Sequence, residues 1–337
     1  MPGAAETLFL PFASGDIDPP AEGQHFAYFN AALPSGELDA ALKAALLCEQ
    51  GYRPEFRRLG EAGFEVSPVL GSPAGTCAAA LVLAGKHRDE NRRMIARACA
   101  AVATGGLVAV SGDKSLGIGS LRKWAGERVE ILGSLAKHHA AVFWFAAPER
   151  DAFAASPETG AVVNGRFETG PGMFSHGKPD RGSQLLAEHF GPRISGKVAD
   201  FGCGWGYLSV RLLEVALPDS LALFEAHYPS LQAAGRNVAR VAPALPVTEH
   251  WTDLRAEPVA RQFDWIVMNP PFHAGRSAEP DIGKAFVRAA SAALLPGGRL
   301  LMVANRKLPY EDTLSRSFRR VTPLSETEGY KLIEAVR

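Results

Sequence analysis

The tetrapeptide Asn269-Pro270-Pro271-Phe272 has the most specific chemistry of any stretch in this sequence. It follows the apolar run from Phe263 to Met268, so we expect it where a buried strand ends and a loop begins. A planar aromatic amine is a poor nucleophile because its lone pair is delocalised into the ring. A site that alkylates such an amine therefore needs hydrogen-bond acceptors that draw its protons out of the plane.

The residues of the tetrapeptide can each serve that reaction. The side-chain carbonyl of Asn269 is one acceptor, and two consecutive prolines can hold the backbone carbonyl of Pro270 rigidly as a second. Phe272 offers a face on which a base can stack, and His273 beside it is a candidate substrate contact. The alternative is a Pro-Pro strand terminator, with Phe272 in the core and His273 as a capping or core residue.

A glycine-rich turn lies upstream of the tetrapeptide. The short apolar strand expected at 198–201, which contains Asp200, runs into Gly202-Cys203-Gly204-Trp205-Gly206, and a helix is expected from about Tyr207. A strand, a GxGxG turn and a helix in this order allow the backbone to approach a ligand closely at the start of the helix. The pattern alone is weak, because glycine-rich turns are common.

Acidic residues after the next two expected strands strengthen the ligand hypothesis. Glu225 lies 23 residues beyond Gly202, where a carboxylate can accept from both hydroxyls of a ribose. Asp253, after a third strand near 246–249, is a candidate acceptor for an adenine amine, with an ordinary loop Asp as the alternative. A nicotinamide dinucleotide fits less well, because the third glycine follows the second by two residues rather than three. S-adenosylmethionine has a ribose and an adenine but no pyrophosphate, so it suits this variant.

The chain is long enough for two α/β domains, and we expect them at 1–150 and 166–337 with a turn-rich linker at 151–165. The first half predicts a mostly parallel sheet from strands at Thr7–Phe12, Ala79–Leu83, Leu107–Val110 and Ala141–Phe145, with helices near Glu37–Glu49 and Glu90–Val102. The second half predicts a seven-stranded mixed sheet, closed by an antiparallel pair at Phe318–Thr322 and Tyr330–Val336.

An internal echo links the two halves. A helix, a Gly-Gly turn and a strand occur at Gly297-Gly298 and again at Gly105-Gly106. Opposite the Asn-Pro-Pro-Phe end of the later copy, the earlier one has the segment 84–87, Ala-Gly-Lys-His. A duplicated fold whose first copy lost the site explains this pattern, and chance likeness between two α/β domains is the alternative.

Composition favours a cytoplasmic globular protein. No apolar run approaches the length of a membrane span, and no cationic region precedes the apolar stretch near the N-terminus. The four cysteines form no CxxC pair, so we expect neither a metal site nor disulfides. Lys plus Arg and Asp plus Glu number 36 each, with 15 against 16 in residues 1–150 and 21 against 20 in 151–337. Only local basic patches are therefore available to a nucleic acid, and solvated helix faces also explain them: Arg88, Arg92, Arg93 and Arg97, and Arg316, Arg319 and Arg320.

The second half resembles the class I S-adenosylmethionine-dependent methyltransferases, and more closely the bacterial small-subunit ribosomal RNA guanine-N2 methyltransferases. The resemblance covers about residues 169–337. It rests on the following segments: Pro171-Gly172-Met173-Phe174-Ser175, Asp180 with Gly182-Ser183-Gln184-Leu185-Leu186, Asp200-Phe201-Gly202-Cys203-Gly204, Asn269-Pro270-Pro271-Phe272-His273, and Val303-Ala304-Asn305. This family has two methyltransferase-like domains in tandem, the first without a cofactor site. Trp205 and Glu225 depart from it, since a small or polar residue and an Asp are usual there.

The resemblance implies roles for individual residues. Gly202, Gly204 and Gly206 would shape the S-adenosylmethionine turn, Asp200 would support it, Glu225 would bind the ribose and Asp253 the adenine. Asn269 and Pro270 would align the amine. Met173 and Phe174 are candidates for a lid over the pocket, and packing residues of a mobile loop are the alternative. The substrate would be a guanine in ribosomal RNA or in a ribosomal subunit, with 16S rRNA favoured, and a monomer is compatible with the sequence. Two alternatives stay open: a protein glutamine-N5 methyltransferase and a non-catalytic RNA-binding or assembly protein.

Overall fold

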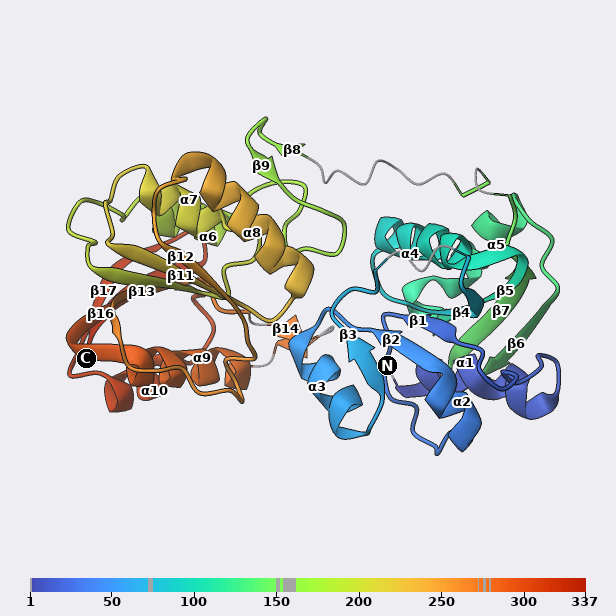
Figure 1. Cartoon of the computed structure of the whole chain (residues 1–337). Helices are drawn as coiled ribbons and strands as arrows, with labels where there is room; N and C mark the ends of the chain where they lie inside the picture. Colours follow the sequence, from blue (N-terminus) through green and yellow to red (C-terminus); the bar gives the residue numbers. More distant parts are fainter. Residues whose placement is uncertain are drawn as a thin grey trace. The chain divides into compact units, whose positions relative to one another are not determined.

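The computed structural model describes residues 2–71, 75–149, 152–153, 162–271, 273–274, 277–278 and 280–337, without the side chains of 2, 162 and 273–280 (Figure 1). The chain divides into two compact units, Met1–Glu158 and Thr159–Arg337. Each unit contains a seven-stranded mixed sheet covered by helices, so the predicted fold class of two tandem Rossmann-like domains is confirmed. Most of the linker expected at 151–165 lies outside the described residues.

The first unit is built on a sheet with the strand order β3-β2-β1-β4-β5-β7-β6. Its strands are β1 (Phe26–Phe29), β2 (Leu46–Glu49), β3 (Glu65–Ser67), β4 (Cys77–Ala84), β5 (Val102–Asp113), β6 (Gly133–Lys137) and β7 (Ala140–Ala146). Its helices are α1 (Pro2–Ser14), α2 (Ala40–Ala45), α3 (Arg53–Glu61), α4 (Arg88–Ala101) and α5 (Ile118–Gly126), with a 3-10 turn η1 at Lys114–Leu116. All strand pairs of this sheet are parallel except those that β7 makes with β5 and β6, which agrees with the mostly parallel sheet that the sequence predicted.

The strand predicted at Thr7–Phe12 is wrong, because this segment belongs to helix α1. Ala4, Ala5, Leu8 and Phe9 recur at helical spacing and are all buried in one cluster beneath the sheet. Phe9 meets Tyr28 of β1 edge-on at 5.7 Å between ring centroids. A short apolar run does not distinguish a buried strand from one face of a helix, which is why the pattern misled.

The helix predicted near Glu37–Glu49 is also wrong in its second half. Asp39 caps α2 by accepting from the backbone amides of Ala41 and Leu42, but the helix ends at Ala45. The next four residues form β2, a buried strand that pairs in parallel with β1. Burial between strands outweighs the helical spacing of leucines in this segment.

The second unit repeats the strand order as β12-β11-β10-β13-β16-β18-β17. Its strands are β10 (Lys197–Phe201), β11 (Ser220–Glu225), β12 (Val247–Trp251), β13 (Phe263–Met268), β16 (Leu294–Asn305), β17 (Arg320–Thr327) and β18 (Tyr330–Val336). Two small hairpins add β8 (Val162–Val163) with β9 (Phe167–Glu168) and β14 (His273–Ala274) with β15 (Ser277–Ala278). Its helices are α6 (Arg181–Ala187), α7 (Tyr207–Leu213), α8 (Tyr228–Val241), α9 (Pro280–Ala293) and α10 (Glu311–Ser317).

The internal echo in the sequence corresponds to a repeat in the structure. Gly105 and Gly297 have φ angles of 83° and 82°, a conformation that favours glycine. A Cβ on the following residue, Gly106 or Gly298, would lie 2.9 Å from a backbone carbonyl oxygen in both cases. The two turns are therefore the same structural feature, at the same place in two sheets of the same order.

Two hydrophobic clusters lie on the two faces of the second sheet. One contains Val198 and Val267 with side chains from α6, α7 and α8, and the other contains Ala199 and Ile266 with side chains from α9 and α10. Figure 1 shows these helix groups on opposite faces of the sheet. Within the described ranges, no helix combines the length and the apolar character that crossing a membrane requires.

Candidate functional site

The sheet register of the second unit brings the predicted site residues to one edge. Strand β10 lies between β11 and β13, with Phe201 opposite Phe224 and Asp200 opposite Val267. The three strands are parallel, so the segments that follow them leave the sheet side by side. We call the glycine turn 202–206 together with Glu225, Asp253 and Asn269 the strand-end site.

The glycine turn depends on backbone conformations that other residues rarely adopt. Gly202, Gly204 and Gly206 have φ angles of 76°, 54° and 87°. A Cβ on Gly206 would lie 3.0 Å from the Cα of Ala234, so this glycine allows α8 to pack against the turn. A Cβ on Gly204 would meet nothing within 4 Å. The turn is therefore packed on its inner side, and Gly204 faces open space where a ligand can approach.

Glu225 joins the end of β11 to this turn. Its Oε2 accepts from the backbone amide of Gly204 at 2.8 Å, and its Oε1 accepts from that of His227 at 2.9 Å. Burial raises the pKa of Glu225, and the hydrogen bonds from the backbone amides oppose that rise. Each carboxylate oxygen can accept more than one hydrogen bond, so Glu225 can hold the turn and still accept from a diol.

Asp200 lies beneath the turn and is fully buried. Its Oδ2 accepts from the hydroxyl of Ser209 on α7 at 2.7 Å, whereas its Oδ1 has no hydrogen-bond partner in the described part of the chain. The pKa of Asp200 is raised to about 7, mainly because burial penalises the charged carboxylate. The charge of the neighbouring Glu225 also raises the pKa, and the hydrogen bond from Ser209 partly opposes the rise. This position suits the supporting role that the sequence suggested.

Asp253 follows β12 and lies near Glu225 along the sheet edge, since the amide of Thr252 donates to the Glu225 carbonyl at 3.0 Å. Asp253 is buried, and both of its carboxylate oxygens accept from Arg255, at 2.9 and 3.1 Å. The predicted adenine acceptor is thus already an ion-pair partner. Its role at a ligand stays a prediction.

The orientation of the Asn269 side chain is fixed by its neighbours. Its amide nitrogen Nδ2 donates to Asp180 Oδ2 at 2.8 Å and to Ser183 Oγ at 2.9 Å. A carboxylate can only accept, so the nitrogen must face Asp180 and the carbonyl oxygen must face away. Among the described residues, none donates to that oxygen. The geometry leaves the Asn269 carbonyl available as an acceptor.

The remaining residues of the tetrapeptide are less fully described. Pro270 is buried directly after Asn269, and Pro271 is exposed. Phe272 lies outside the described residues, so its stacking role stays a prediction. Only the backbone of His273 is described, in the hairpin β14–β15.

Phe174 lies on a loop that Trp205 of the glycine turn holds in place. The Trp205 indole nitrogen donates to the Phe174 backbone carbonyl at 2.8 Å, and its ring packs edge-on against Phe167. The Phe174 side chain is 59% exposed, whereas Met173 is buried. The departure from the family at Trp205 therefore links the turn to the loop that we expected to close over the pocket.

Two other expectations concern metals and basic patches. In the ranges that the structure describes, no group of three or more His, Cys, Asp and Glu side chains could hold a metal ion. Arg97 forms a double hydrogen bond with Glu49, at 2.6 Å each, and stacks on Phe29. Arg92 lies 3.5 Å from Asp89. At least these two members of the α4 basic patch are engaged within their own unit.

The first unit has different residues at the positions equivalent to the strand-end site. Phe29 of β1 lies opposite Glu49 and Val82, so the next residues along these three chain segments are Asn30, Gln50 and Leu83, of which Leu83 still belongs to β4. By sheet register they correspond to Gly202, Glu225 and Asn269, so the expected match of segment 84–87 to the Asn-Pro-Pro-Phe end is wrong by one residue. Gln50 accepts from the amide of Tyr52 at 2.8 Å, as Glu225 accepts from His227, but it is a neutral amide and donates to the Ala31 carbonyl. The first unit therefore keeps the strand order but has different side chains at the positions of Glu225 and Asn269.

Sequence reasoning assigned no role to Asp180, Ser183 or Asn237. Asp180 before a helix carries an N-cap signal, but its bond to Asn269 spans 89 positions and has no local signature. Asn237 on α8 donates to the carbonyls of Trp205 and Glu168 and accepts from the Glu168 amide. It therefore connects the glycine turn to β9.

The fold and the strand-end site define the class of methyltransferases that the sequence resembles, and comparison with known proteins agrees. The family described as methyltransferase small domain matches residues 164–334. Because this match covers half of the chain, the chain belongs to that family.

Two curated relatives of this chain share one name. The chain is 36% identical over 161 residues to a ribosomal RNA small subunit methyltransferase C of Shewanella loihica, covering 48% of this chain and 46% of the relative. It is 35% identical over 169 residues to the protein of the same name from Escherichia coli, covering 50% and 48%. The matched region thus spans about half the length of these curated relatives.

One solved structure matches both units. It is described as the T. Thermophilus 16S rRNA N2 G1207 methyltransferase (RsmC) in complex with AdoMet and guanosine. The TM-score is 0.79 at 26% identity, and the match covers 99% of this chain and 91% of that one. The tandem arrangement of this chain is therefore present in a solved protein.

The buried carboxyl of Asp200 predicts a pH dependence of stability. Its pKa is about 7 in the folded chain, against an ordinary value of 3.8, so the folded state binds more protons between these values. The contribution of Asp200 to the free energy of unfolding therefore falls as pH rises from about 4 to about 7. We expect the stability of Asp200→Asn relative to the parent to increase across this window, by up to about 4 kcal/mol. Urea unfolding of both proteins at about pH 5 and about pH 8 measures it, and a difference independent of pH would contradict the assignment.

Proposed function

We propose that this protein transfers a methyl group from S-adenosylmethionine to the exocyclic N2 amine of a guanine in ribosomal RNA, with 16S rRNA as the favoured substrate. The observation that carries the proposal is the fixed Asn269 amide. Both of its donor protons are engaged, and its carbonyl oxygen is left as an acceptor beside the glycine turn. An exocyclic amine needs such an acceptor.

The residues of the strand-end site fit a nucleoside cofactor. Open space lies over Gly204, and the Glu225 carboxylate has acceptor capacity left for the two ribose hydroxyls. When bound, the sulfonium cofactor supplies an activated methyl group. Glu225 and the glycine turn bind and orient it, and Asp253 is the expected acceptor for the adenine amine.

Asn269 and Pro270 act on the acceptor amine. The nitrogen would become cationic as its bond to the methyl group forms and the C–S bond of the donor breaks, and fixed carbonyl oxygens favour that charge without reorganising. The sulfonium would leave as a neutral thioether, and the surplus N–H proton would pass to solvent. Positioning dominates an in-line transfer of this kind, and no covalent enzyme intermediate is needed. The chain therefore needs rigid acceptors more than an acid or a base.

Guanine-N2 of ribosomal RNA is supported by the comparisons rather than by the geometry, since Asn269 would accept from any exocyclic amine. The Shewanella and Escherichia relatives are named for ribosomal RNA of the small subunit. The solved structure that matches both units is a guanine-N2 enzyme in complex with guanosine. Met173 and Phe174 on the loop beside Trp205 are expected to close over a base there, and His273 and Phe272 to contact it.

The substrate assignment predicts a single modified nucleoside. Purified enzyme, a labelled methyl donor and small subunits or 16S rRNA from a strain lacking the enzyme should yield N2-methylguanosine on nucleoside analysis. Asn269→Ala protein serves as the matched control and should give little product. Label in another nucleoside or in protein would contradict the substrate assignment and leave the family assignment intact.

Substitutions of Asn269 and Glu225 should affect different steps. We expect Asn269 to act on the substrate amine, and therefore on the transfer rate, and Glu225 to act on cofactor affinity. Asn269→Ala should slow single-turnover transfer by about 100-fold or more, with cofactor affinity nearly unchanged. Glu225→Gln keeps an acceptor for the backbone, as Gln50 does in the first unit, and should weaken cofactor binding by about 10-fold or more. Calorimetry and single-turnover rates measure the two effects. Equal rates for the parent and Asn269→Ala at saturating substrates would make Asn269 structural.

A further inference from the structure

We propose that Asp180 is a positioning residue for the transfer, and that it acts only through Asn269. This inference rests on the proposed function, since it assigns the orientation of the acceptor in the same site. Asp180 lies on the loop before α6, 89 positions from Asn269 in the sequence. Its carboxylate oxygen Oδ2 accepts from the Asn269 amide at 2.8 Å.

The hydrogen bonds of the Asn269 amide admit one orientation. An asparagine amide has two donor protons, and Asp180 Oδ2 and Ser183 Oγ provide two acceptors, at 2.8 and 2.9 Å. If the amide were flipped, its oxygen would face a carboxylate, and both groups would be acceptors. Asp180 thus excludes the orientation that would turn an N–H toward the substrate amine.

Asp180 is itself held in place at the N-terminus of α6. The same oxygen, Oδ2, accepts from the Ser183 amide at 2.9 Å, so the residue is the N-cap of the helix. A Cβ on Gly182 would lie 3.1 Å from this oxygen and 2.8 Å from the Tyr330 ring, so the glycine lets both approach the helix. The carboxylate therefore has little freedom to leave Asn269.

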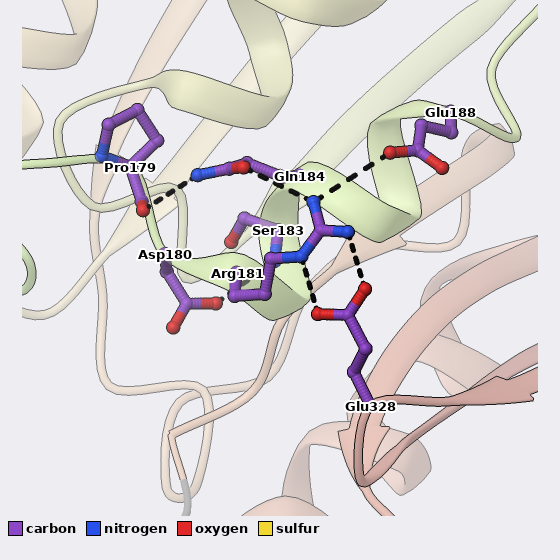
Figure 2. A network of polar contacts seen from close by, with 7 residues as sticks. All are labelled: Pro179, Asp180, Arg181, Ser183, Gln184, Glu188 and Glu328. Carbon is purple, nitrogen blue, oxygen red and sulfur yellow. Dashed lines mark hydrogen bonds and ion pairs between the residues drawn. The ribbon is translucent and has the colours of Figure 1, made fainter.

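Surrounding contacts tie the start of α6 to the rest of the second unit (Figure 2). Arg181 donates to Glu328 with Nε at 2.8 Å and with Nη2 at 2.6 Å, and Glu328 lies in the turn between β17 and β18. Gln184 donates to the Pro179 carbonyl at 2.9 Å. The ion pair is exposed, so it contributes little to stability. The ion pair nevertheless joins the start of α6 to the turn between β17 and β18.

The negative charge of Asp180 adds to its geometric effect. A hydrogen bond to an ionised acceptor is stronger than a neutral one, and consecutive hydrogen bonds polarise each other. The Asn269 carbonyl oxygen is therefore a better acceptor when its amide nitrogen donates to a carboxylate. This effect grows as the substrate nitrogen becomes cationic.

Three substitutions separate the roles of Asp180. Asp180→Ser keeps a good N-cap, but the hydroxyl is too short to reach Asn269. Asp180→Asn keeps a cap and a neutral acceptor and removes the charge. Asp39→Ser is the matched control, because Asp39 caps α2 of the first unit by the same kind of bond.

We expect Asp180→Ser to slow single-turnover methyl transfer by about 10- to 100-fold and Asp180→Asn by less. Cofactor affinity by calorimetry should be unchanged in both, and Asp39→Ser should match the parent in rate. In an Asn269→Ala background Asp180→Ser should have no further effect, because the residue acts through that side chain. Rates equal to the parent, or effects of the two substitutions that add, would overturn the proposal.

A second measurement does not depend on the substrate. In protein labelled with 15N at asparagine, the Asn269 amide signal is assigned by its loss in Asn269→Ala. We expect it to shift and to exchange faster with solvent in Asp180→Ser, and an unchanged signal would overturn the proposal. The rate comparison measures the total labelled methyl group transferred, whichever nucleoside or protein receives it. If that product is not N2-methylguanosine, the proposed function fails while the test of Asp180 stands.

Discussion

The parallel register of β11, β10 and β13 is the constraint on which the site depends. It sets the turn after β10 beside Glu225 and Asn269, which are far apart in sequence. The bond from the Gly204 amide to Glu225 then fixes the turn against the end of β11. Because the core alternates between two faces of the same strands, shifting any of these three by one residue would bury the wrong side chains and misplace the site.

The two units show how a fold can be kept while its chemistry changes. Both units have the same strand order and the same Gly-Gly turn, so the two halves of the chain share one architecture. Gln50 keeps the backbone hydrogen bond that Glu225 makes, but not the charge. Leu83 at the position of Asn269 has no acceptor. The first unit therefore has the sheet of the second without the charged and amide side chains of its strand-end site.

The sequence predicted those features that follow directly from local patterns. The fold class and the strand ends at the glycine turn, Glu225 and Asn269 were predictable because each follows a short apolar run. Helix α1 and strand β2 were not, because short apolar segments fit either state and packing decides between them. The bond between Asp180 and Asn269 joins two distant segments, and the role of Trp205 depends on a loop 31 positions away. Such contacts exist only once the sheet has formed.

We expect only the second unit to bind the cofactor, because Gln50 and Leu83 take the places of Glu225 and Asn269 in the first. Calorimetric titration of S-adenosylmethionine into the full chain and into the separate units, Met1–Glu158 and Thr159–Arg337, tests this most directly. Circular dichroism first establishes that each fragment is folded. We expect one site in the full chain, one of similar affinity in Thr159–Arg337, and none in Met1–Glu158. Saturable binding to folded Met1–Glu158, or no binding to folded Thr159–Arg337, would contradict it.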